Sequence, residues 1–168
     1  SKNLEPFLAA HRQELAADLA LISDTGMWDV DTPAITARLR GMSYVQITLK
    51  AAKRDLHSGL FGGSALNPIN ALTRILGDLH DDQGRIQLPG FYDGIKPVSN
   101  AQRAQWDSLG FDEKAFLGDI GLTTPIGERG YAPLERLWAR PTADINGIWG
   151  GYQGEGSKTV IPAEASAK

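Results

Sequence analysis

The chain of 168 residues contains no cysteine, which excludes disulfide bonds and thiolate metal ligands. This absence fits a reducing compartment, and we expect a cytoplasmic protein. Acidic and basic residues nearly balance, 20 against 17, so the formal net charge is −3 and provides no basic footprint for nucleic acid. The longest aliphatic run, Leu19 to Ile22, is far too short to span a bilayer. We therefore expect neither nucleic acid nor a membrane as a partner.

Several well-known catalytic and binding motifs are also missing. The glycine-rich stretch that ends at Gly156 fails as a phosphate-binding loop, because Ser157 intervenes before Lys158 and no helix is expected to follow. There is no dinucleotide fingerprint, no H-E-x-x-H and no G-x-S-x-G. The three histidines, His11, His57 and His80, are far apart in the sequence. A complete metal site needs several converging ligands, and this chain alone does not predict one.

The first 33 residues read as a helix, a short strand and a linker. Leu4, Phe7, Leu8, Leu15 and Leu19 have helical spacing, which predicts a helix that begins after Asn3 and continues to about Leu19. The run 20–23 predicts a buried parallel strand with Asp24 at its carboxyl end, where sites form in open α/β sheets. Residues 25–33 read as a linker.

A different pattern begins after the linker. Apolar and polar residues alternate over 35–40 and again over 45–51, which predicts a β-hairpin with one wet face. Asn67 and Pro68 are typical of a helix start, and the apolar stripe from Ile69 to Leu79 is expected to cover the dry face of that hairpin. Short helices are predicted at 100–109 and 112–117, and a second strand pair at 142–148 and 159–168. Together these elements predict an α+β fold, an antiparallel sheet with helices packed on one face.

The run Asp55-Leu56-His57-Ser58-Gly59-Leu60-Phe61-Gly62-Gly63 is the strongest candidate for a functional motif. An imidazole at the end of a strand-like run, followed at once by a glycine-rich turn, is presented rather than buried. A loop histidine without a task is the plain alternative. Ser58 is discounted as a nucleophile, because adjacent side chains at the end of a strand tend to point apart.

Two further segments favour a functional His57 over a loop histidine without a task. They are Lys158-Thr159-Val160-Ile161-Pro162-Ala163 and Leu88-Pro89-Gly90-Phe91-Tyr92-Asp93. Together with the His57 run they resemble the lid, or dimerisation, domain of the dinuclear-zinc dipeptidases related to carnosinase and aminoacylase. The resemblance implies a ferredoxin-like lid over residues 33–168, truncated at its C-terminus. It also implies that residues 1–32 are a helix–strand piece of an α/β catalytic domain with its linker.

The resemblance also implies roles for three residues. Asp24 would be one ligand of a two-zinc site, its alternative being a turn former at the end of a strand. His57 would enter the active site of the partner subunit, polarise the scissile carbonyl and stabilise the oxyanion. Thr159 would contact the carboxyl end of the substrate. Arg140 is tempting as the clamp for that carboxylate, but we interpret it as structural.

The implied parent is a zinc metallopeptidase that hydrolyses dipeptides or short peptides as a homodimer. Most of the zinc ligands would lie outside this chain, so we expect the 168 residues alone to be inactive. The alternative is a non-catalytic self-association module, in which the edge strand of a sheet pairs with its twin across a two-fold axis.

Overall fold

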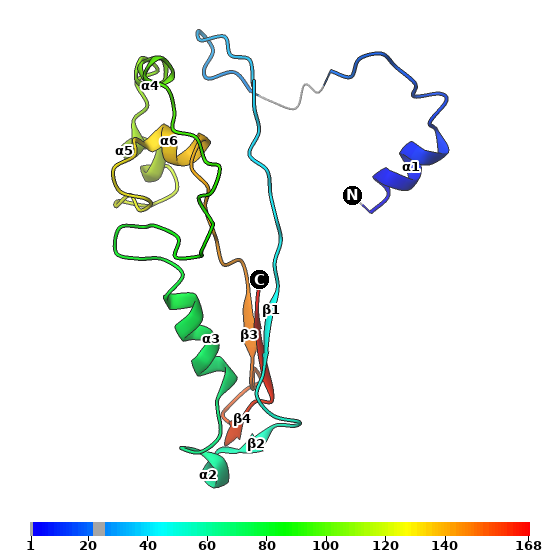
Figure 1. Ribbon diagram of the computed structural model, residues 1–168, viewed down its shortest axis with the longest axis vertical. Helices are drawn as coiled ribbons and strands as arrows, with labels where there is room; N and C mark the ends of the chain where they lie inside the picture. The colour runs from blue at the N-terminus through cyan, green and yellow to red at the C-terminus, as the bar shows by residue number, and fades with distance from the viewer. Residues whose placement is uncertain (1, 22–25) are drawn as a thin grey trace. The chain divides into compact units, whose positions relative to one another are not determined.

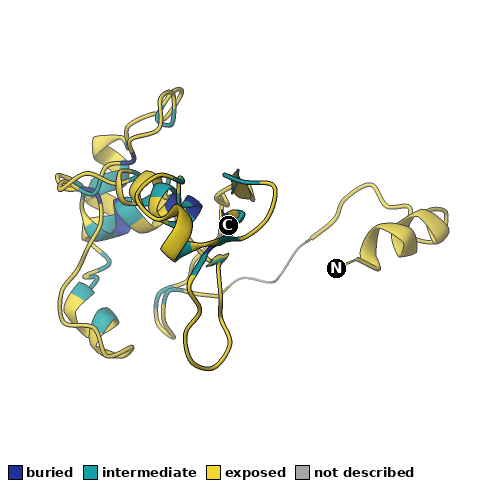
Figure 2. Cartoon of the chain, turned by 90° about the horizontal axis from the view of Figure 1, so that it is seen from below, coloured by how far each residue is buried: buried dark blue, intermediate teal, exposed yellow. Residues whose placement is uncertain are grey.

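The computed structural model describes residues 2–21 and 26–168, in two compact units, Ser1–Leu39 and Arg40–Lys168. In the first unit, helix α1 spans Leu4–Ala10 and is exposed along its whole length (Figure 2). The predicted continuation of this helix to Leu19 is wrong, because turns follow α1 and both Leu15 and Leu19 are exposed. A short helix whose apolar side chains are not buried gains too little to extend. Ala20 and Leu21 lie outside any strand, and Asp24 is not among the described residues.

The main sheet of the second unit is antiparallel and has the order β1-β5-β3 (Figure 1). Strand β1 spans Ile47–Lys50, β3 spans Ile148–Gly150 and β5 spans Glu164–Ala167. Ala167 lies opposite Ile47 on one side and Ile148 on the other. The central strand therefore comes from the end of the chain.

The predicted hairpin of residues 35–40 with residues 45–51 is wrong. Residues 33–46 contain no strand, and Ile35 and Leu39 are almost fully exposed. The second arm does hold strand β1, but its partner is β5, more than a hundred residues away. Alternation identifies the two faces of a strand, and it carries no information about which strand lies beside it.

Helix α3, Pro68–Gly77, confirms the predicted start and the predicted apolar stripe. The Asn67 side-chain oxygen accepts hydrogen bonds from the backbone N–H groups of Ile69 at 2.9 Å and Asn70 at 3.4 Å, and Pro68 occupies the first turn. Leu72 is fully buried against Ala165 and Ala167 of β5. Leu49, Ile69 and Leu76 pack around this core. One helix thus covers one face of the antiparallel sheet, which confirms the α+β class.

A second, two-stranded sheet carries the candidate site. Strand β2, Leu56–His57, pairs antiparallel with β4, Val160–Ile161, and the one-turn helix α2, Ser58–Phe61, follows β2 directly, at the foot of Figure 1. The single strand predicted over 159–168 is divided into β4 and β5 at Pro162 and Ala163, because proline cannot donate to a strand ladder. The strand predicted at 142–148 is wrong in its bounds, because residues 142–147 contain no strand and β3 shares only Ile148 with the prediction.

Three short helices follow α3 in the chain and precede β3: α4 at Asn100–Asp107, α5 at Glu113–Gly118 and α6 at Pro133–Trp138. They form one group above α3 in Figure 1. The sequence predicts α4 and α5, and it does not predict α6. Trp106 of α4 meets Trp138 of α6 edge to face, with ring centroids 5.3 Å apart, and Arg136 pairs with Glu113. Across the described ranges 2–21 and 26–168, no helix has the length and hydrophobicity that a membrane span requires.

Glu135 ties α4 to α6 from a buried position. Its carboxylate accepts a hydrogen bond from Arg103 Nε at 2.8 Å and another from the backbone N–H of Ala132 at 3.1 Å. Burial by itself raises the pKa of this carboxyl, but the Arg103 and Ala132 hydrogen bonds outweigh it, so the pKa is lowered below 4.5. The carboxylate form is therefore part of the folded structure.

We predict that Leu72→Ala lowers the free energy of unfolding of the 168-residue chain by about 2–5 kcal/mol, because the fully buried side chain leaves a cavity between α3 and β5. Ile75→Ala, on the same helix at 48% exposure, is the matched control and should cost less than about 1 kcal/mol. Urea titration measures both. Equal losses in the two variants would contradict the packing of α3 on the sheet.

We predict that part of the stability is lost in acid through Glu135. Because its folded pKa lies below the ordinary 4.5, its contribution is complete above pH 4.5 and disappears as the pH falls through the lowered value. Glu135→Gln should be less stable than the wild type above pH 4.5, and the difference should shrink as the pH falls. The exposed Glu155→Gln variant, measured in the same urea titrations, should follow the wild-type curve.

Candidate functional site

The candidate site is built where β2 ends and α2 begins. His57 lies opposite Val160 in the β2–β4 pair, and the backbone N–H of Ser58 donates to the Thr159 carbonyl at 3.1 Å. This register brings the side chains of His57 and Thr159 together from positions 102 residues apart. Both side chains belong to exposed residues. Two of the three residues singled out from the sequence are therefore neighbours, while the third, Asp24, is outside the described residues.

The His57 imidazole makes a contact through each ring nitrogen. Nδ1 lies 3.0 Å from the backbone nitrogen of Gly59, whose N–H donates to it. Nε2 lies 3.2 Å from the hydroxyl oxygen of Thr159. The ring is thus exposed to solvent and at the same time held by a contact at each nitrogen.

The backbone that carries His57 is fastened to the corner between β4 and β5. The carbonyl of Ala163 accepts hydrogen bonds from the N–H groups of Ala51 at 2.8 Å and Ala52 at 3.3 Å. The N–H of Ala163 donates to the carboxylate of Asp55 at 2.8 Å. The segment between β1 and β2 is consequently fixed to the segment that joins the two sheets.

Asp55, the first residue of the His57 motif, has a structural role near the site that the sequence does not predict, because its carboxylate holds the backbone of Ala163. The position of Asp55 does indicate such a role in general terms, because an acidic side chain just before a strand often accepts a backbone hydrogen bond. Its partner, Ala163, lies 108 residues away, and no local pattern identifies it.

Gly59 and Gly62 of the motif lie so close to neighbouring atoms that a side chain at either position would collide with them. A Cβ on Gly59 would lie 2.9 Å from Cε1 of His57, so the imidazole packs directly against the glycine backbone. A Cβ on Gly62 would lie 2.5 Å from the backbone carbonyl oxygen of Ser58. The glycine-rich segment is therefore a one-turn helix with fixed packing, where the sequence predicted a turn.

An open hollow of 610 Å³ lies beside the His57 segment. It is bounded by the end of α2, the start of α3 and strand β4. The residues around it are mostly small or polar: Ser58, Gly62, Gly63, Ser64, Ala65, Leu66, Asn67, Asn70, Val160 and Ile161. This surface has room for a neighbouring segment of chain or a peptide.

The described residues do not fit a metal centre. Within 2–21 and 26–168, no group of three or more His, Asp or Glu side chains is arranged to hold an ion. His57 has Thr159 and Gly59 as its neighbours, neither of which is a carboxylate or an imidazole. The site can donate a hydrogen bond and can contact a polar group, and these residues alone cannot activate water on a metal.

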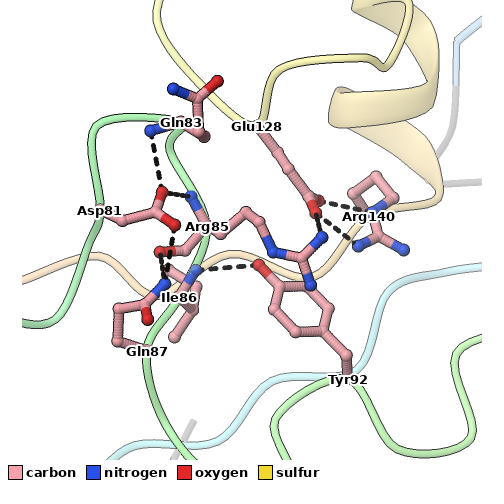
Figure 3. A network of polar contacts seen from close by, with 8 residues as sticks. All are labelled: Asp81, Gln83, Arg85, Ile86, Gln87, Tyr92, Glu128 and Arg140. Atoms are coloured by element: carbon pink, nitrogen blue, oxygen red, sulfur yellow. Dashed lines mark hydrogen bonds and ion pairs between the residues drawn. The ribbon is translucent and has the colours of Figure 1, made fainter.

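Arg140 is engaged inside the fold, in agreement with its interpretation as structural. Glu128, which is 6% exposed, accepts hydrogen bonds from Arg140 Nε at 2.6 Å and from its terminal nitrogen at 2.8 Å (Figure 3). The guanidinium also lies over the rings of Tyr131 at 4.2 Å and Tyr92 at 4.9 Å. The hydrogen bonds that Arg140 donates to Glu128 raise the pKa of Arg140, against the opposing effect of burial. This cation is already paired, so it is a poor clamp for a substrate carboxylate.

Known proteins resemble this chain over most of its length. Residues 38–168 match the family described as the peptidase dimerisation domain. The chain is 34% identical to the Cys-Gly metallodipeptidase of Candida albicans over 151 residues, and 32% identical to the human Beta-Ala-His dipeptidase over 151 residues. Each alignment covers 90% of this chain, but only 31% and 30% of the respective relatives. The chain thus spans about a third of the length of these curated relatives.

A solved structure matches nearly the whole chain. The metallo-carboxypeptidase from Sulfolobus solfataricus superposes with a TM-score of 0.74 at 28% sequence identity. The match covers 98% of this chain and 37% of that protein.

We predict that Gly62→Ala destabilises the chain by about 1–3 kcal/mol, because the new Cβ would collide with the Ser58 carbonyl, which cannot move without distorting α2. Gly77→Ala is the matched control, since it has open space around the new Cβ and should change stability by less than about 1 kcal/mol. Thermal unfolding of both variants checks this. A fully stable Gly62→Ala variant would contradict the tight packing of α2.

Proposed function

Because this chain belongs to the peptidase dimerisation domain family, we propose that it is the lid and dimerisation segment of a zinc-dependent dipeptidase, with His57 acting in the active site of the partner subunit. The observation that carries the proposal is the construction of the His57 site. The ring is exposed, it is held by both nitrogens, and the described part of its own chain provides no metal centre. Such a histidine is suited to a site completed by another surface.

The proposed substrates are dipeptides or short peptides. The relatives' names, a Cys-Gly metallodipeptidase and a Beta-Ala-His dipeptidase, support this class of substrate. His57 would donate a hydrogen bond to the scissile carbonyl oxygen and to the oxyanion that forms from it. A preorganised donor in a site from which water is excluded stabilises a transition state by roughly 3–4 kcal/mol. Thr159, beside the ring, would contact the carboxyl end of the substrate.

The proposed zinc ions belong to the catalytic part of the parent, where a zinc-bound water would be the nucleophile. We propose Asp24 as one of their ligands and residues 1–32 as a piece of that catalytic domain, with the lid beginning at residue 33. The remaining ligands would come from parts of the parent outside this chain.

We propose that the parent is a homodimer joined through the lid. Strands β1 and β3 are the edges of the three-stranded sheet, and an edge strand presents unpaired N–H and C=O groups to a second chain. On β3, Ile148 and Trp149 are 52% and 39% exposed. The same edges also favour the alternative function, a self-association module without chemistry of its own.

We predict that His57→Ala in the full-length parent lowers kcat on the order of 100-fold or more, with little change in stability. The ring is exposed, so truncation removes no core packing. His80→Ala is the matched control, since His80 is also exposed and lies outside the site. Steady-state hydrolysis of a dipeptide panel measures kcat, and the 168-residue chain alone should show no turnover.

Mixed dimers test whether His57 acts across the subunit boundary. A His57→Ala subunit is combined with a subunit that has an intact lid and an inactivated catalytic domain. If the imidazole acts in trans, each mixed dimer regains one working site. No recovered activity in a demonstrably mixed dimer would reject the proposal, and so would strong turnover by the purified 168-residue chain.

A further inference from the structure

The two hydrogen bonds of the His57 ring together fix which nitrogen carries its proton. A backbone N–H is only a donor, so Nδ1, which receives the Gly59 N–H at 3.0 Å, is the unprotonated nitrogen of the neutral ring. The proton is then on Nε2. This nitrogen lies 3.2 Å from the Thr159 hydroxyl, which can accept its N–H.

The local fold leaves the ring little freedom to leave this arrangement. His57 is the residue that caps α2, which places the Gly59 amide under the ring. On the other side, the hydrogen bond from Ser58 N–H to the Thr159 carbonyl fixes the backbone of Thr159, from which the hydroxyl reaches Nε2. The space at Gly59 is closed as well, since even a Cβ there would lie 3.1 Å from Nδ1.

We propose that Thr159 is a positioning residue for His57, and that Gly59 and Thr159 together preset the Nε2–H tautomer that the reaction uses. This inference rests on the proposed function and adds to it a second task for Thr159 besides contact with the substrate. Before substrate arrives, Nε2–H donates to the Thr159 hydroxyl. When substrate is bound, the same N–H donates to the carbonyl oxygen, and no proton is transferred.

The arrangement gives the neutral ring the hydrogen-bond polarity that an oxyanion requires. The opposite tautomer would present a lone pair at Nε2, which repels a developing negative charge. Without the Gly59 and Thr159 contacts, the ring would spend part of its time as the opposite tautomer or in another orientation. The Thr159 hydroxyl keeps its own O–H, which remains able to donate to a carboxylate.

Nuclear magnetic resonance of the ring nitrogens tests the geometry in the 168-residue chain, independently of any activity. The wild type should show a protonated Nε2 and an unprotonated Nδ1 for His57, with His11→Ala and His80→Ala variants used for assignment. Thr159→Val should change these signals, and Thr159→Ser should restore them. Thr48→Val is the matched control, because it removes a hydroxyl that hydrogen-bonds Ser166 in the other sheet. A proton on Nδ1, or His57 signals unaffected by Thr159→Val, would overturn the proposal.

Kinetics of the full-length parent test whether Thr159 acts through the ring. Thr159→Val should lower kcat roughly 3- to 10-fold, because a ring without the Thr159 contact spends part of its time in the wrong form or orientation, and Thr159→Ser should recover it. In the His57→Ala background, Thr159→Val should lower kcat clearly less than it does beside an intact His57, since only the substrate contact of Thr159 is then left to lose. An equal loss of kcat in both backgrounds would show a role independent of His57 and would overturn the inference. The mixed-dimer result is unaffected by that outcome, so the two proposals fail separately.

Discussion

The structure of the second unit depends on the pairing of one short segment, residues 160–167, with three other strands. Its first half, β4, pairs with β2, and its second half, β5, lies between β1 and β3. The core residues Ala165 and Ala167 that receive Leu72 of α3 belong to the same segment. Packing, sheet order and the position of His57 are therefore consequences of a single set of long-range backbone hydrogen bonds.

The elements with local signals could be predicted from the sequence. Asn67 and Pro68 begin a helix wherever they precede an apolar stripe, and α3 forms as expected because each signal agrees with the others. The short helix α6 was missed, although Pro133 in its first turn and Glu135 beyond it are typical of a helix start. Its six residues are too few for periodicity to identify it.

Strand partners could not be predicted, for a physical reason. The alternation over residues 45–51 correctly indicates a strand, β1. The partner of β1 is β5 and not residues 35–40, because β5 carries the alanines that are buried against α3. The same limit applies to the site. His57 and Thr159 were both chosen from short motifs, yet their contact depends on the β2–β4 register. The contact of Asp55 with Ala163, which no local pattern identifies, depends on that assembled corner as well.

The fastening at Ala163 has a consequence for the entropy of binding. This one residue accepts two N–H groups from the segment before β2 and donates to the Asp55 carboxylate, so the approach to His57 is ordered when the chain folds. The conformational entropy of that segment is lost once, in folding, and is not lost again when another surface or a ligand meets the ring. An encounter with His57 is therefore closer to the docking of two rigid bodies than to the ordering of a loop.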